Sequence, residues 1–73
     1  MKMSKPKEYG IVKIYYPLKG YGFITREHGK DLFFLRSSLD DEARIFEGSR
    51  VQFLVQKDGD KDKHMAVNIS RID

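Results

Sequence analysis

Short runs of strand-forming residues, each closed by a turn signal, limit this sequence to an all-β fold. At positions 51–56, Val51, Phe53 and Val55 alternate with a second set of side chains, which is the period-two pattern of a half-buried strand. Further runs rich in Ile, Val, Tyr or Phe occupy residues 9–16, 21–25, 31–35 and 65–70. Five short strands without a long helix predict a five-stranded antiparallel barrel.

The connections between these runs carry turn-forming residues. Residues 17–20 and 27–30 have the composition of tight turns, and Asp58-Gly59 is a hairpin signal. In the longest connection, residues 37–46, Ser38 precedes Asp41 by three positions, a spacing that can cap a helix start. Only about two turns of helix would fit, so we expect a short helical turn inside a loop.

The chain has 73 residues, enough for one small domain. The first eight residues hold three lysines and one glutamate, a net charge of +2, whereas the whole chain carries +3. We therefore expect a flexible basic tail at residues 1–8 and a nearly neutral barrel at residues 9–73. The chain has no cysteine, which favours the cytoplasm, and no apolar run approaches the roughly 20 residues that cross a bilayer. We predict a monomer without membrane contact.

The segment from Lys19 to Ile24, with the sequence KGYGFI, is the most informative motif. Tyr21 and Phe23 are two positions apart, so they face the same side of a strand. Gly22 lies between the two rings and Gly20 precedes them, and Ile24 offers the opposite side to the core. Two such exposed, coplanar rings form a platform on which bases stack, each base being worth roughly 1–3 kcal/mol. The same spacing also fits two rings packed inside a barrel, and the pattern leaves that alternative open.

The apolar run at residues 32–35 offers a second outward ring. By alternation, Leu32 and Phe34 share one side of the strand, and Phe33 and Leu35 share the other. We assign Leu32 and Phe34 to the core and place Phe33 outside, next to Phe23. A strand that is apolar throughout is also typical of one buried on both sides.

These motifs, in this order, resemble the cold-shock domain family. The family's K-G-Y/F-G-F-I motif is matched in full at residues 19–24, and its first strand, G-x-V-K-W-F-N, by residues 10–16. Its V-F-V-H-F-S motif is matched in part by residues 32–37, and its L-x-E-G-x-x-V-x-F and A-x-N-V segments by residues 45–53 and 66–69. The resemblance implies an OB-fold barrel that binds single-stranded RNA or DNA and acts as an RNA chaperone. Sequence preference should be slight, because every base has a π-face.

Three positions depart from the family pattern. Ile14 stands where the family has an exposed Trp, Leu35 where it has His, and Arg36 where it has an aromatic residue. We therefore predict binding that is weaker and more electrostatic than is usual in the family, with Arg36 able both to stack and to contact phosphate. The residues predicted to contact nucleic acid are Lys13, Tyr15, Lys19, Tyr21, Phe23, Phe33, Leu35 and Arg36.

Other classes of protein fit less well. An RNA-recognition motif shares the KGYGF core but carries it on the third strand, and residues 1–18 are too few for the preceding strand and helix. The sequence has no nucleophile elbow, phosphate loop or metal-spaced cluster. We therefore predict no enzymatic activity, no cofactor, no metal site and no small-molecule substrate.

The remaining polar features fit an exposed surface. His28 and His64 are interpreted as solvated groups, and residues 58–62 as a polar turn despite their likeness to the start of a calcium loop. The acidic residues 40–42 are interpreted as a solvated loop that repels a passing backbone. One alternative stays open: aliphatic Ile14 and Leu35 leave a face that also suits a protein partner.

Overall fold

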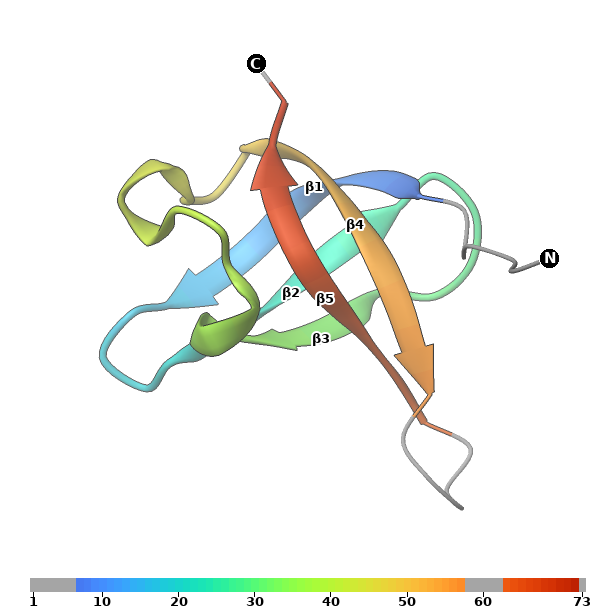
Figure 1. Ribbon diagram of the computed structural model, residues 1–73, viewed down its shortest axis with the longest axis horizontal. Helices are drawn as coiled ribbons and strands as arrows, with labels where there is room; N and C mark the ends of the chain where they lie inside the picture. The colour runs from blue at the N-terminus through green and yellow to red at the C-terminus, as the bar shows by residue number, and fades with distance from the viewer. Residues whose placement is uncertain (1–6, 58–62, 73) are drawn as a thin grey trace, which may run out of the picture.

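Strands of a closed barrel make up most of the computed structural model, which describes residues 7–57 and 63–72 (Figure 1). The strands are β1 (Glu8–Tyr16), β2 (Tyr21–Arg26), β3 (Leu32–Leu35), β4 (Arg50–Lys57) and β5 (His64–Arg71). Their order along the chain is the predicted one, and β1 begins one residue before the predicted barrel boundary. Most of the predicted basic tail lies outside the described residues.

Of the five pairs of neighbouring strands, four are antiparallel and one is parallel; we call the junction within each pair a seam. Around the barrel the order is β1-β2-β3-β5-β4. β3 and β5 run in the same direction and pair at Phe33 and Met65, whereas the other neighbours run in opposite directions. An odd number of strands in a closed ring cannot alternate in direction at every seam. The predicted five-stranded antiparallel barrel is therefore confirmed, with parallel pairing at this one seam.

A β-bulge in β1 reverses the side that each following residue faces. Val12 pairs with Ile24, and Ile14 pairs with Phe23, so Lys13 between them has no partner of its own in β2. Val12 is buried, Lys13 is exposed, Ile14 is half-buried, and the next buried residue is Tyr15. An extra residue of this kind shifts the alternation of a strand by one position. The last three residues of β1 are therefore out of phase with the first five.

The core fills the barrel with one side of each strand. Buried apolar residues come from all five strands and from the β3–β4 loop: Val12, Tyr15, Ile24, Leu32, Phe34, Ile45, Val51, Phe53, Ala66 and Ile69. The inward orientation predicted for Leu32 and Phe34 is confirmed. In β5 a second phase shift occurs at Asn68, whose φ of 53° is tolerated by Asn better than by most residues.

Gly22 makes room for the core rather than for the outer rings. It is buried on β2 opposite Tyr15. A Cβ atom at this position would lie 2.7 Å from Cζ of Phe34 and would collide with the carbonyl oxygen of Ile14. Only a residue without a side chain lets the Phe34 ring approach the strand this closely. The glycine in the middle of the KGYGFI motif is thus required by an inner ring.

The long connection between β3 and β4 contains two short 3₁₀ turns, η1 (Arg36–Ser38) and η2 (Glu42–Arg44). The predicted helical turn is therefore present as two separate turns. Neither carries a side-chain capping hydrogen bond, so the cap predicted from the Ser38 spacing is absent. The predicted Asp58-Gly59 hairpin and the calcium-like residues 58–62 lie outside the described residues. No helix within residues 7–57 and 63–72 is long and apolar enough to cross a membrane.

Candidate nucleic-acid interface

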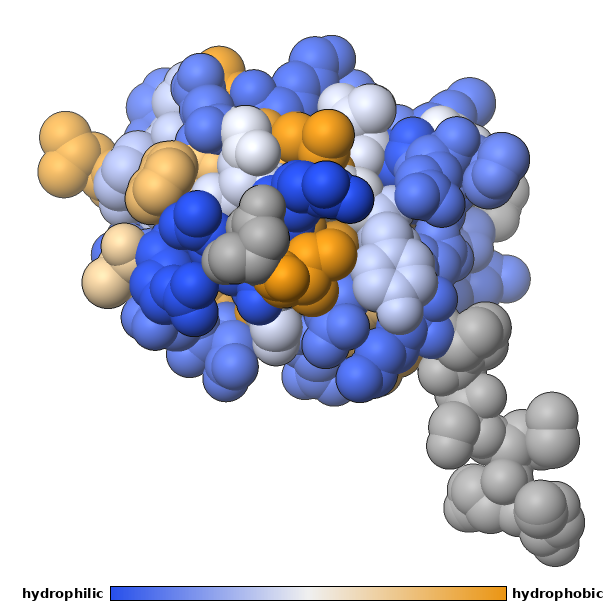
Figure 2. All heavy atoms as spheres, turned by 90° about the horizontal axis from the view of Figure 1, so that it is seen from above, coloured by the Kyte–Doolittle hydropathy of each residue, from blue (hydrophilic) through white to orange (hydrophobic). Residues whose placement is uncertain are grey.

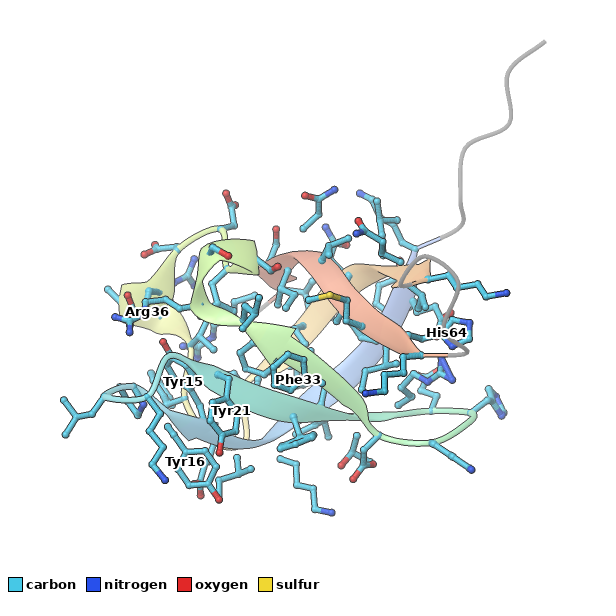
Figure 3. All side chains as sticks on the ribbon, turned by 90° about the horizontal axis from the view of Figure 1, so that it is seen from below. Tyr15, Tyr16, Tyr21, Phe33, Arg36 and His64 are labelled. Atoms are coloured by element: carbon cyan, nitrogen blue, oxygen red, sulfur yellow. The ribbon has the colours of Figure 1, made fainter. Side chains whose placement is uncertain are left out.

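Outward side chains of β1, β2 and β3 form two rows that cross the strands. Cross-strand pairing gives one row of Tyr16, Tyr21 and Leu35 and a second row of Ile14, Phe23, Phe33 and Met65. All of these side chains are at least partly exposed. We call the surface formed by the rings of Tyr16, Tyr21, Phe23 and Phe33 the aromatic face. Figure 3 looks onto this side of the barrel, with Tyr16, Tyr21 and Phe33 labelled.

The rings of the aromatic face contact one another but do not share a plane. Tyr21 and Phe33 lie 5.7 Å apart, centroid to centroid, at an angle of 33°. Phe23 meets both of them edge to face, at 89° to Tyr21 and 68° to Phe33. The coplanar arrangement predicted for Tyr21 and Phe23 is therefore wrong. Edge-to-face contacts are a favourable geometry for neighbouring rings, and they leave each ring with its own accessible surface.

Tyr15 does not belong to the aromatic face. It is only 8% exposed, and its ring lies 5.7 Å from Phe34 in the core. Its hydroxyl donates a hydrogen bond of 2.7 Å to Oε2 of Glu42. Burial, and next the hydrogen bond to Glu42, raise the pKa of this phenol. The stacking role predicted for Tyr15 is therefore wrong, because the bulge at Lys13 turns its ring inward.

Tyr16 takes the outward place that was predicted for its neighbour. It is 38% exposed, lies opposite Tyr21, and its ring is 5.3 Å from the Tyr21 ring. Sequence reasoning missed Tyr16 because strict alternation from Val12 puts it on the inner side. The one available signal was the family pattern itself. The family's exposed Trp aligns with Ile14, so Tyr16, two positions further, shares its side.

Three predicted basic residues lie at the rim of the aromatic face. The ammonium of Lys19 is 5.6 Å from the centroid of the Tyr16 ring, within reach of a cation–π contact. Lys13 forms a 2.9 Å ion pair with Asp31, and Nε of Arg36 is 3.9 Å from Oε2 of Glu42. Two of the three cations thus have a carboxylate partner. The positive charge available to phosphate is smaller than the count of basic residues indicates.

The opposite end of the face, where β5 begins, carries further basic groups. Phe23, Phe33 and Met65 line a shallow hollow of about 500 Å³ together with charged or titratable Asp31, Lys63 and His64. His64 is exposed, as predicted, and Figure 3 shows it at the far end of the face from Arg36. Sequence reasoning did not connect residues 63–65 to the site. Their approach to Phe33 depends on the parallel seam between β3 and β5.

The structure therefore brings together most of the predicted contact residues. Tyr21, Phe23 and Phe33 form the centre, Leu35 lies beside Tyr21 and is 41% exposed, and the three basic residues surround them. Tyr15 alone faces away. In the part of the chain that the structure describes, no group of His, Asp and Glu side chains is arranged to hold a metal ion.

Comparisons of the sequence and of the fold with known proteins both find cold-shock domains. The family model for the 'cold-shock' DNA-binding domain matches residues 8–72. The Retron Se72 cold shock-like protein of Salmonella heidelberg is 42% identical over 53 residues, which are 68% of this chain and 79% of that protein. Among solved structures, drosophila Unr CSD456 matches with a TM-score of 0.79 and 22% identity, over 96% of this chain and 28% of that longer chain. At this identity the last match shows the fold alone.

Proposed function

The chain belongs to the cold-shock domain family, a nucleic-acid-binding family, and we propose that it binds single-stranded RNA or DNA on the aromatic face. The observation that carries this proposal is the pair of outward rows on β1, β2 and β3. Four rings lie within 6.2 Å of a neighbouring ring and have basic side chains at both ends. Rings with basic groups beside them are the combination that takes up unpaired bases and their phosphates.

The binding mode is passive stacking. Bases that have left their own stack lie on Tyr16, Tyr21, Phe23 and Phe33, and each is worth roughly 1–3 kcal/mol. Lys19 and the residues around His64 lie where the backbone passes. Rings accept any base, so sequence preference is slight. By favouring unpaired strands, the protein melts weak hairpins by mass action, which is an RNA-chaperone activity.

Two features keep the affinity below that of a fully aromatic face. Ile14 and Leu35 occupy positions within the two rows where a ring would add a stacking surface. Carboxylates accompany Lys13 and Arg36 and reduce their attraction for phosphate. Affinity therefore rests mainly on four rings and depends on salt through the few cations without a nearby carboxylate.

Titration with a single-stranded oligonucleotide of about seven nucleotides, within the site size of an OB fold, tests this proposal. The protein has no Trp and four Tyr, two of which are on the aromatic face, so binding should quench tyrosine fluorescence. Phe23→Ala should weaken binding at least about fivefold, the low end of one lost stack. Phe46→Ala is the matched control, because Phe46 is an exposed ring in the β3–β4 loop. Equal affinity of both folded variants would contradict the proposal.

A protein partner is the competing function, and the surface supports it less well. Away from the aromatic face, exposed apolar residues include Tyr9, Ile11 and Ile72, which line a separate hollow together with Arg26 and Arg50. Figure 2, which shows the side opposite to that of Figure 3, has apolar side chains in small separate groups among polar ones. Protein interfaces more often use one continuous apolar patch.

A further inference from the structure

Glu42 reaches the edge of the aromatic face from a loop that is distant in sequence. It is the first residue of η2, in the connection between β3 and β4. Its Oε2 atom accepts the hydrogen bond from the Tyr15 hydroxyl and also lies 3.9 Å from Nε of Arg36. One carboxylate oxygen is thus hydrogen-bonded to a core phenol and lies close to a rim guanidinium. The sequence indicated a solvated loop at residues 40–42. The contacts of Glu42 show that this interpretation is incomplete for that residue.

The Tyr15 hydroxyl fixes the position of this carboxylate. The Tyr15 ring is buried against Phe34, so its hydroxyl has a set position in the barrel wall. A donor held in this way restricts a long side chain that would otherwise sample many rotamers in solvent. The Glu42 side chain remains 43% exposed, so the carboxylate is anchored but stays in contact with water.

Arg36 is also held in place, beside the Tyr21 end of the aromatic face. Its backbone amide donates a 2.9 Å hydrogen bond to the carbonyl oxygen of Gly20. Its guanidinium packs so closely over Gly20 that a Cβ atom there would lie 2.8 Å from Nη2. Arg36 directly follows Leu35, which is paired with Tyr21. A strand whose base stacks on Tyr21 therefore brings a phosphate close to this guanidinium.

We infer that Glu42 is an internal competitor for phosphate at Arg36 and sets how much this cation contributes to nucleic-acid binding. The inference rests on the proposed function of the aromatic face. In the free protein the carboxylate lies 3.9 Å from Nε of the guanidinium, so its negative charge competes with that of a phosphate approaching the same cation. A bound strand must displace Glu42 or accept its repulsion. Exposed ion pairs are weak, so the competition reduces affinity without preventing binding.

Neutralising Glu42 should therefore strengthen binding and increase its salt dependence. Glu42→Gln keeps an oxygen that can accept the Tyr15 hydrogen bond, while the charge opposite Arg36 is lost. We expect an affinity gain of about threefold to fivefold at low salt, the scale of an exposed ion pair. For single strands, each neutralised phosphate adds about 0.7 to the slope of log affinity against log salt, so the slope should steepen by up to that amount.

Two further variants separate local competition from a general change of charge. Asp41→Asn is the matched control: Asp41 is exposed and adjacent in sequence, and its loss changes the net charge equally. It should give less than half of the Glu42→Gln gain. In an Arg36→Ala background, Glu42→Gln should add no more than Asp41→Asn does. Thermal unfolding of each variant verifies that all are folded.

The measured affinities distinguish local competition at Arg36 from a general effect of charge and from failure of the proposed function. A larger gain for Glu42→Gln than for Asp41→Asn, abolished by Arg36→Ala, supports the competition. Equal effects of the two neutral variants, or a Glu42 effect that survives the loss of Arg36, overturn it while leaving the proposed function intact. A wild-type protein that binds no single-stranded oligonucleotide at either salt concentration overturns the proposed function, and this inference with it.

Discussion

Phe33 and Phe34 are neighbours on β3, yet one belongs to the outer surface and the other to the core. Phe34 has no exposed surface and packs against Tyr15, whereas Phe33 faces outward between Phe23 and Tyr21. The same contrast divides Tyr15 from Tyr16 on β1. The residue type is the same in each pair, and only the side of the strand differs. The inner rings should therefore govern stability, and the outer rings should govern affinity for nucleic acid.

The largest expected effect comes from the inner ring of this comparison. Phe34→Ala removes a fully buried ring and should lower the free energy of unfolding by about 3–5 kcal/mol. In a domain this small, such a loss takes away much of the total stability. Urea denaturation measures it, and Phe34→Leu, which retains part of the volume, allows oligonucleotide binding to be measured in a folded protein. A Phe34→Ala variant as stable as the wild type would contradict the inward assignment.

The outer ring should give the reverse result. Phe33→Ala removes a stacking surface and should weaken oligonucleotide affinity by roughly 1–3 kcal/mol. Its stability should change by less than about 1 kcal/mol, the usual range for side chains that remain partly in water. Fluorescence titration and urea denaturation of the same preparation measure the two quantities. A Phe33→Ala variant that lost stability but kept its oligonucleotide affinity would contradict the assignment of Phe33 to the outer face.

The Tyr15 hydroxyl offers a smaller test of the inner face. Tyr15→Phe keeps the buried ring but loses the hydrogen bond to partly exposed Glu42, so stability should fall by about 1–2 kcal/mol near neutral pH. Because the folded-state pKa of Tyr15 is raised above its ordinary value of 10.0, its contribution is complete below pH 10. It is lost as the pH rises through the folded-state pKa. The stability difference between wild type and variant should therefore stay constant from neutral pH to pH 10 and shrink above pH 10.

The smallest expected effect is a gain on the outer face. Ile14→Trp places a ring opposite Phe23, in the second row, and should tighten binding by about 1 kcal/mol, the low end for one added stack. Isothermal titration with the same oligonucleotide measures the change. Ile11→Trp is the control, because Ile11 lies three residues before Ile14 on β1 and outside both rows. Equal gains from the two substitutions would mean that position in the rows does not matter.

The sequence predicted the strands and the orientation of β3 because both follow from simple alternation. Leu32 and Phe34 inside, and Phe33 outside, needed no more than a period of two. The orientation of Tyr15 could not be derived in this way, because it depends on one extra residue in β1. The pattern Val-Lys-Ile-Tyr-Tyr is compatible with a regular strand and with a bulged one, and pairing with β2 decides between them.

The positions of Glu42 and His64 beside the aromatic face also could not be predicted from the sequence. Glu42 is 27 residues from Tyr15, and the two meet only because the β3–β4 connection crosses back over the end of β1. His64 reaches the aromatic face only through the parallel seam between β3 and β5. Both contacts depend on how distant segments meet around the closed barrel, which local propensity does not specify.

The bulge in β1 separates two tasks within one strand. Residues 8–11 pair with β4 and so help to close the barrel, whereas Ile14 and Tyr16 pair only with β2 and lie in the two outward rows. Substitutions of these two outward residues should therefore have little effect on barrel closure, unlike substitutions of the buried Tyr15. Ile14, which stands where the family pattern has Trp, is a position of this kind. The outward surface of this strand can thus be altered by design while the barrel stays closed.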